Sequence, residues 1–231
     1  MAERGALRFR FAFSFRPFSV IFFCRLPMTF KLLRNLFPAA LIAASLALAG
    51  CNDAPGTASV KAEPTPVSIA AIAAEAKGFT VGTPMSARTV YVFFDAQCPH
   101  CAVLWQAAKP LKSQAKFVWI PVGLINPSST AQGATLLAAK DPVALMDEHE
   151  TSMRAKRGGI SAGSDIDAQK AVVAKNTKLM TRFGFSSIPS IVATHAQSGA
   201  LVSREGGLPT AELAAFLGLQ PPAEAPAAGA N

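Results

Sequence analysis

A Cys-x-x-Cys motif placed between a strand and a helix is the feature that most constrains this sequence. Residues 88–94 (RTVYVFF) are β-branched and aromatic with little alternation, which predicts a strand buried on both faces. The motif Cys98-Pro99-His100-Cys101 follows, and residues 99–113 predict a helix, because Pro99 suits a first helical turn and an apolar face recurs after it. Pro110 is expected to kink that helix. A second strand is predicted over 116–122, so these segments predict a right-handed βαβ unit.

The rest of the chain predicts an all-helical segment and then a return to strands. The predicted elements are helices over 131–140, 142–151 and 167–183 with a glycine-rich loop at 158–163, strands over 188–194 and 200–205, and a closing helix over 210–217. Gly218 is expected to end that last helix. The order β-α-β, helical insertion, β-β-α is the thioredoxin arrangement. We therefore expect an α/β protein with a thioredoxin-like fold and an inserted helical subdomain.

A short apolar run near the N-terminus predicts an export signal. Lys31 and Arg34 precede residues 37–50, an apolar run of only 14 residues, whereas a membrane-spanning helix needs roughly 20. The run ends in Leu48-Ala49-Gly50-Cys51, which resembles the lipobox of bacterial lipoproteins. In that group the signal is removed before the cysteine and the cysteine carries lipid, so we expect a lipid anchor at Cys51 that holds the protein to the envelope membrane. The alternative is an ordinary secreted protein in which Cys51 is incidental.

These features divide the chain into five parts. Residues 1–27 are arginine-rich and lie ahead of a normal-looking signal that begins at Met28, so we interpret them as an extension from a start site placed too early. An extended signal and an organelle transit peptide are the alternatives. The parts expected are this extension at 1–27, a lipoprotein-type signal peptide at 28–50, a flexible tether with a short helix at 51–77, the thioredoxin-like domain at 78–219 with its helical insertion at about 127–183, and a disordered tail at 220–231.

Charge and cysteine content exclude two other classes of protein. The formal net charge of +8 comes mostly from residues 1–50, which hold seven basic residues and one acid and leave +2 for the remainder. A near-neutral domain lacks the basic patch that nucleic-acid binding needs, so we expect no nucleic-acid partner. Four cysteines are too few for a fold held together by disulfides; they are Cys24, Cys51, Cys98 and Cys101.

Cys98 and Cys101 are predicted to form a redox-active pair. Both stand at the start of a helix, where free N–H groups and the helix dipole stabilise a thiolate. We expect Cys98, at the exposed lip of the turn, to be the attacking sulfur, and Cys101, one turn further in, to be the more buried resolving thiol. A protonated His100 between them would further stabilise the Cys98 thiolate and make the disulfide more oxidising.

Other uses of the motif fit the sequence less well. Half of a zinc site would need further ligands, and only His149 and His195 are left, at a spacing that matches no zinc pattern. Covalent haem attachment would need histidine where the chain has Ala102. A purely structural disulfide would close a very short loop and stabilise little. We therefore expect no metal and no cofactor at this site.

Several other residues are assigned roles by their position. Ile188-Pro189 begins a strand after a helix, where thioredoxin-like proteins place a cis-proline facing the motif. Pro189 is thus expected to border the active site, and Ile188 to lie on an edge where substrate pairs, with an ordinary strand-starting proline as the alternative. Asp95 is expected to cap the turn, with a proton-relay role as its alternative. Two pairs complete the set: Trp105 and Trp119 are expected in the core, and His149 and His195 at the surface or at strand ends.

Several separate blocks resemble one known family. Tyr91-Val-Phe-Phe-Asp-Ala-Gln-Cys-Pro-His-Cys101, followed by Leu104-Trp105-Gln106, is similar to the catalytic domain of the DsbC/DsbG group of periplasmic disulfide isomerases, above all its DsbG type. The similar blocks beyond it are 122–127, 138–142, 176–180 and 206–209. The resemblance implies an envelope thiol:disulfide oxidoreductase in the periplasm, with Cys98 nucleophilic, Cys101 resolving and Pro189 the cis-proline. It also implies exported cysteine-containing proteins as partners, and a membrane redox partner of the DsbB or DsbD kind.

Two departures from that family affect the expected function. Its members carry an N-terminal dimerisation domain, whereas residues 52–87 are too few for one, so we expect a monomer. Ile188 stands where those isomerases usually have threonine, and Pro99-His100 is the dipeptide of the strong oxidase DsbA. The oxidase, isomerase and reductase directions therefore all stay open. The alternative function is a thioredoxin-fold chaperone that delivers metal or copper with the two cysteines as ligands, although no methionine lies near the motif in sequence.

Overall fold

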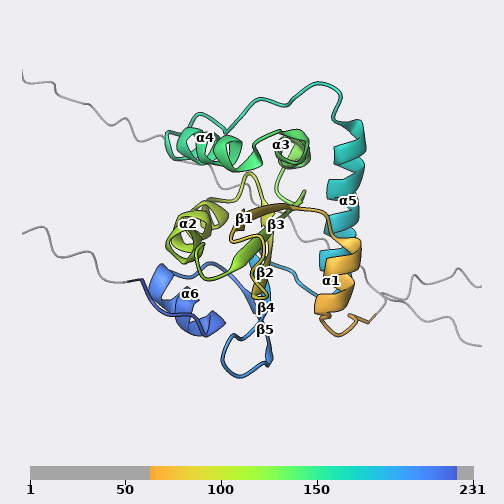
Figure 1. The fold of residues 1–231 in the computed structure, drawn as a ribbon. Coiled ribbons are helices and arrows are strands. Elements are labelled where there is room, and N and C mark those ends of the chain that lie inside the picture. Colours follow the sequence, from red (N-terminus) through yellow and green to blue (C-terminus); the bar gives the residue numbers. More distant parts are fainter. Residues whose placement is uncertain (1–62, 223–231) are drawn as a thin grey trace, which may run out of the picture. The chain divides into compact units, whose positions relative to one another are not determined.

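A five-stranded mixed sheet forms the centre of the domain in the computed structural model, which describes residues 63–222 (Figure 1). The strand order is β1-β3-β2-β4-β5, with β2 and β3 parallel and the other neighbours antiparallel. The strands are β1 Phe79–Gly82, β2 Thr89–Asp95, β3 Lys116–Val122, β4 Ser190–Thr194 and β5 Leu201–Glu205. The predicted βαβ unit and the later strand pair are thus confirmed.

Helices cover both faces of this sheet. The helices are α1 Ile69–Glu75, α2 Pro99–Ala108, α3 Pro127–Ala138, α4 Pro142–Arg154, α5 Asp167–Arg182 and α6 Thr210–Leu217. On β2, Val92 and Phe94 belong to a core cluster that α2, α4 and α6 share, while Phe93 belongs to a second cluster with α1 and α5. The strand is therefore buried on both faces, as its unalternating sequence predicts.

The helical insertion, α3 to α5, lies between β3 and β4. Asn126 caps α3 by accepting a hydrogen bond from the Ser128 N–H at 2.8 Å, and the Asn126 N–H donates to the Ser129 hydroxyl at 3.1 Å. Asp141 caps α4 through the N–H groups of its first turn. Each of these two helices begins with a proline, which has no N–H to leave unpaired there, so side-chain caps and prolines together fix both starts.

Several observed elements differ from the expected ones, and in two of them only a boundary moves: β4 begins at Ser190 rather than at 188, and α4 ends at Arg154 rather than at 151. The helix predicted over 99–113 ends at Ala108 and continues as a 3₁₀ turn, Lys109–Leu111, where a kink at Pro110 was expected. The first inserted helix begins at Pro127 rather than at 131. β1 is a strand that the sequence does not predict, because its four residues are too few for a periodic signal and it depends on antiparallel pairing with β3.

α1 packs against α5, so the packed region begins before residue 78. Ile72 is fully buried, the Glu75 carboxylate pairs with Arg182 at 2.6 Å, and the Thr65 N–H donates to the Arg182 carbonyl at 2.9 Å. A helix is therefore present in the segment where a short one was expected, and the residues around it contact the domain. No helix within residues 63–222 has both the length and the apolar character that crossing a bilayer requires.

Candidate active site

The motif cysteines lie where β2 ends and α2 begins. The Cys98 N–H donates to the Asp95 carbonyl at 3.0 Å, and Cys98 is the N-cap residue of α2. Its Sγ accepts a hydrogen bond from the backbone N–H of Cys101 at 3.3 Å. The Cys98 sulfur therefore lies at a helix N-terminus, where unpaired N–H groups and the helix dipole favour an anion.

The two thiols differ in accessibility. Both are free, Cys101 is fully buried and Cys98 is 5% exposed. Cys98 is thus less exposed than a residue at the lip of the turn was expected to be, and the Ile188 carbonyl oxygen lies 3.8 Å from its Sγ. The expected order still holds, with Cys98 the more accessible residue of the pair.

The surroundings separate the pKa values of the two thiols. A hydrogen bond with the Cys101 thiol, together with the backbone N–H groups of Cys101 and His100, lowers the pKa of Cys98 to about 7 despite its burial. Burial raises the pKa of Cys101 well above the ordinary value, and its interactions with Cys98 raise it further. Near neutral pH, Cys98 ionises while Cys101 keeps its proton. The His100 side chain is exposed, and the contribution of its imidazole stays a prediction.

The segment before β4 borders the Cys98 sulfur. The Ile188-Pro189 peptide bond is cis, as predicted, and the carbonyl oxygen of this same bond contacts Cys98. Gly207 lies between His100 and Pro189, where there is little room for a side chain. A Cβ added there would lie 3.2 Å from the His100 carbonyl oxygen and 4.0 Å from Pro189 Cγ. The fold therefore brings the motif and the Ile188-Pro189 segment together at one surface.

Asp95 is buried beneath the turn and acts as its cap. It is fully buried, and its Oδ1 accepts a hydrogen bond from the Gln97 N–H at 2.8 Å. Its Oδ2 accepts from the N–H groups of Leu124 at 2.7 Å and Ile125 at 3.1 Å. The capping role is the one expected from the sequence, and it also fastens the turn to the segment after β3. The proton-relay alternative stays a prediction.

The helical insertion contacts the loop before the motif through residues whose place the sequence does not show. His149 is fully buried rather than at the surface, with its Nε2 2.7 Å from the Ala96 carbonyl oxygen and its Nδ1 accepting from the Ile160 N–H at 3.2 Å. The surface expectation for His149 was wrong because tertiary contacts, rather than helix periodicity, bury this ring. The Gln97 amide nitrogen donates to Gln132 Oε1 at 2.5 Å and to the Gly158 carbonyl at 3.2 Å, so side chains and backbone of the insertion fix this loop.

The tryptophans and the other histidine lie as expected. Trp105 and Trp119 are buried, and their rings meet edge to face with centroids 4.9 Å apart. His195 directly follows β4 and is partly exposed. These residues therefore have packing or surface roles.

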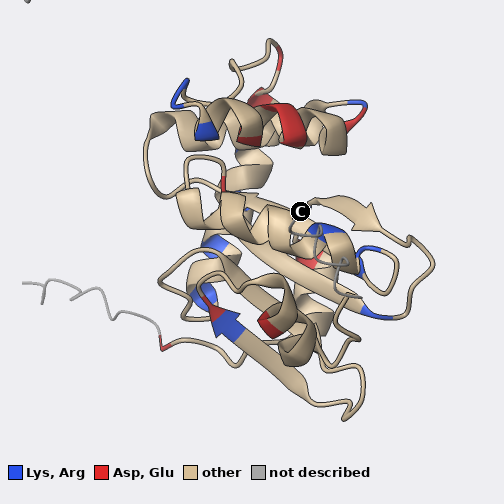
Figure 2. Ribbon diagram, turned by 90° about the vertical axis from the view of Figure 1, so that its left-hand side faces the viewer, with Lys and Arg blue, Asp and Glu red and all other residues tan. Residues whose placement is uncertain are grey.

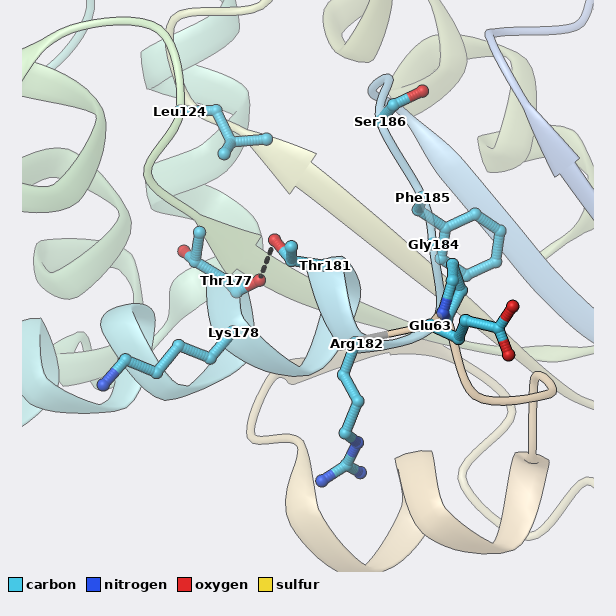
Figure 3. A pocket seen from close by; sticks show the side chains of 10 residues that line it. Glu63, Leu124, Thr177, Lys178, Thr181, Arg182, Gly184, Phe185 and Ser186 are labelled. Atoms are coloured by element: carbon cyan, nitrogen blue, oxygen red, sulfur yellow. Dashed lines mark hydrogen bonds between the residues drawn. The ribbon is translucent and has the colours of Figure 1, made fainter. Parts of the chain in front are cut away.

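Two cavities lie beside the helices of the domain, one between α2 and α4 and one along α5. One of about 360 Å³ lies beside the motif between α2 and α4, and its lining residues are Pro99, Ala102, Val103, Gln106, Met153 and Arg154. Met153, distant in sequence, is thus brought beside the motif. A larger cavity of about 680 Å³ lies along α5, where the Thr181 hydroxyl donates to the Thr177 carbonyl at 3.0 Å and Phe185 closes one side (Figure 3). Neither motif cysteine lines this second cavity.

Cys51, where a lipid anchor was expected, lies outside the described residues, as does the apolar run before it. Among residues 63–222, no group of three or more His, Cys, Asp or Glu side chains is arranged to hold a metal ion.

Comparison with characterised proteins relates the chain to one group. No protein-family model matches it. It is 33% identical over 133 residues to the thiol:disulfide interchange protein DsbG of Pseudomonas aeruginosa, and 36% identical over 104 residues to DsbG of Escherichia coli. These matches cover 57% and 44% of this chain but 51% and 42% of those proteins. The chain therefore spans about half the length of the curated relatives it matches.

Solved structures show the fold. A periplasmic thioredoxin-like protein from Salmonella enterica serovar Typhimurium aligns with a TM-score of 0.52 at 16% identity, over 67% of this chain and 97% of that one. Proteus mirabilis ScsC in a transitional conformation aligns with a TM-score of 0.51 at 15% identity, over 66% and 78% of the two chains. The domain thus has a thioredoxin-like α/β fold, and its sequence is similar to that of DsbG thiol:disulfide interchange proteins.

Proposed function

We propose that this protein is a thiol:disulfide oxidoreductase that exchanges disulfides with cysteine-containing proteins through Cys98 and Cys101. The observation that carries the proposal is the unequal pair of thiols: Cys98 at a helix N-terminus with a pKa of about 7, and Cys101 buried with a raised pKa. The thiolate is the reactive form in disulfide exchange, and a protonated buried neighbour does not compete with it. The similarity to DsbG proteins supports the same activity.

The exchange proceeds through a mixed disulfide on Cys98. When a client is oxidised, a client thiolate attacks the Cys98 sulfur, the Cys98–Cys101 bond breaks, and Cys101 takes up a proton. A second client thiolate then attacks the client sulfur of the mixed disulfide, and Cys98 leaves as a thiolate. Two electrons pass from client to protein. In the reducing direction the Cys98 thiolate attacks a client disulfide, and Cys101 resolves the product.

The client chain docks beside Ile188 and Pro189. The Ile188 backbone lies against the Cys98 sulfur, so an extended client chain pairing there would bring its own sulfur to the reacting atom. Pro99 and His100 are exposed next to it, and a protonated His100 adds positive charge near the thiolate. Isoleucine at 188 offers no side-chain hydroxyl to this site, which alters substrate preference and redox potential relative to a threonine.

The same proposal includes an envelope location. The apolar run at 37–50 and the sequence Leu48-Ala49-Gly50-Cys51 support export to the periplasm and a lipid anchor at Cys51. There the protein would act as a monomer, with a membrane redox partner of the DsbB or DsbD kind deciding the direction of electron flow. Incorporation of labelled palmitate into the wild type but not into Cys51→Ser tests the anchor. Sedimentation of the processed protein tests the monomer.

Trapping of mixed disulfides tests the activity. Cys101→Ser is expected to accumulate client proteins bound through Cys98, because the resolving thiol is gone, whereas Cys98→Ser is expected to trap few. Diagonal electrophoresis of envelope extracts, with and without reductant, measures the complexes. Equilibration of the purified wild type with glutathione buffers gives the reduction potential of the pair. A pair that does not equilibrate with glutathione, or complexes formed through Cys101, would overturn the proposal.

A further inference from the structure

α4 lies along α2 in the opposite direction, and the second half of α4 contacts α2 at two places. Midway along α4, the Asp147 carboxylate accepts a hydrogen bond from the Trp105 indole N–H at 2.7 Å, in the second half of α2. Near the end of α4, Met153 lines a cavity together with Pro99, the first residue of α2. The part of α4 between Asp147 and Met153 therefore lies beside the first turns of α2, where the motif cysteines are.

A buried carboxylate occupies the position between these two contacts. Glu150 follows Asp147 by three residues and precedes Met153 by three, so all three share one helix face. Glu150 is only 2% exposed, and its Oε2 has no hydrogen-bond partner among the described residues. An unpaired carboxylate in such a place is costly, because burial removes its hydration and no donor replaces it. Figure 2 shows the acidic residues of α4 in red on the uppermost helix.

The charges around Glu150 connect it to the redox pair. Burial raises the pKa of Glu150 to about 7, Arg154 opposes this rise, and the negative charge of Cys98 adds to it. Asp147 raises it further and Lys109 lowers it. The neighbouring His149 is engaged by the Ala96 carbonyl and the Ile160 N–H. An interaction between two titrating groups is mutual, so an ionised Glu150 also disfavours the Cys98 thiolate.

We propose that Glu150 is a positioning residue for the Cys98–Cys101 pair, which holds a proton while Cys98 is a thiolate and releases it when the disulfide forms. The inference rests on the proposed exchange activity. With glutathione disulfide as oxidant, the Cys98–Cys101 bond forms and the glutathione S–S bond breaks. Two electrons pass to glutathione, and the protons of Cys101 and Glu150 end on the two glutathione thiols, while the negative charge moves from Cys98 to Glu150.

The glutathione equilibrium of Glu150→Gln, measured across pH, tests this role. At pH 5.5 the wild-type carboxyl is already neutral, so variant and wild type are expected to agree. At pH 8 the wild-type charge repels the Cys98 thiolate and the amide does not, so the variant is expected to favour the reduced form by about 3–10-fold. The matched control is Glu148→Gln, an exposed carboxylate on the same helix, which is expected to follow the wild type at both pH values.

Three outcomes would overturn the inference. These are an equal effect of Glu150→Gln at both pH values, an equal shift in Glu148→Gln, or no shift at all. If the wild type itself fails to equilibrate with glutathione, the proposed activity fails instead, so the two failures are distinguishable. Infrared difference spectra of the wild type at pH 7 need no folded variant: reduction is expected to increase the C=O band of protonated carboxylic acid, and an unchanged band contradicts the proton transfer.

Discussion

Two buried carboxylates lie near the motif, one at the end of β2 and one on α4, and they are held in opposite ways. Asp95 accepts three backbone hydrogen bonds, from Gln97, Leu124 and Ile125. Glu150 is almost as buried, but its Oε2 has no partner among the described residues. Asp95 is therefore a structural anchor whose oxygens both accept backbone hydrogen bonds, while burial raises the pKa of Glu150 to about 7, so that it readily keeps a proton. Donors, rather than burial alone, decide what a buried carboxylate does.

The largest effect is expected from Asp95→Ala. Three backbone N–H groups would lose the buried carboxylate that accepts from them, and a donor left unpaired costs about 1–3 kcal/mol where it is buried, so we expect a loss of roughly 3 kcal/mol in the free energy of unfolding. Denaturant titration at pH 7 measures it. A loss below about 1 kcal/mol would mean that Asp95 is not the anchor of this turn and would remove the contrast with Glu150.

Glu150→Gln, in contrast to Asp95→Ala, is expected to increase the free energy of unfolding above neutral pH. Because the folded pKa of Glu150 is raised from 4.5 to about 7, the folded state binds the proton more tightly than the unfolded chain. The resulting stabilisation is complete below pH 4.5 and is lost as pH rises to 7, on the order of 3 kcal/mol. Glutamine does not ionise, so the variant keeps its stability as pH rises, and its free energy of unfolding should exceed that of the wild type at pH 8. Parallel stability curves for variant and wild type from pH 5 to 8 would contradict the assignment.

The smallest effect is expected from His100→Ala. The groups that lower the pKa of Cys98 are chiefly the Cys101 thiol and backbone N–H groups, which this change leaves in place. Removal of an exposed imidazole should therefore raise the Cys98 pKa by only roughly 0.5 or less. Thiolate absorbance against pH measures it. A rise above about 1 would show that the imidazole, rather than the helix N-terminus, controls the thiolate.

Local sequence patterns predicted the part of the molecule that holds the cysteines. The run of residues in β2, the proline that starts α2 and the spacing of Cys98 and Cys101 are all signals within about twenty residues, and the structure places them as expected. The cis bond before Pro189 was predicted because thioredoxin-like proteins place a cis-proline at this point of the chain, and the residues around Pro189 do not by themselves predict it.

Contacts between distant segments could not be predicted in this way. β1 exists because it pairs with β3, and His149 is buried because α4 lies over the loop before the motif. Helix periodicity places Glu150 and Met153 on one face of α4, but nothing in the sequence shows that this face meets α2. His149, Glu150 and Met153, which the structure adds to the surroundings of the motif, therefore reach it through the tertiary packing of α4.

Alkylation of the reduced protein with iodoacetamide across pH, with each cysteine followed by peptide mass spectrometry, tests the central claim most directly. Only thiolates react, so the rate at each cysteine reports its ionisation. We predict that Cys98 reacts with a midpoint near pH 7 and that Cys101 stays unmodified until well above the ordinary thiol range. Faster modification of Cys101, or a Cys98 midpoint at the free-thiol value of about 8.5, would contradict the account.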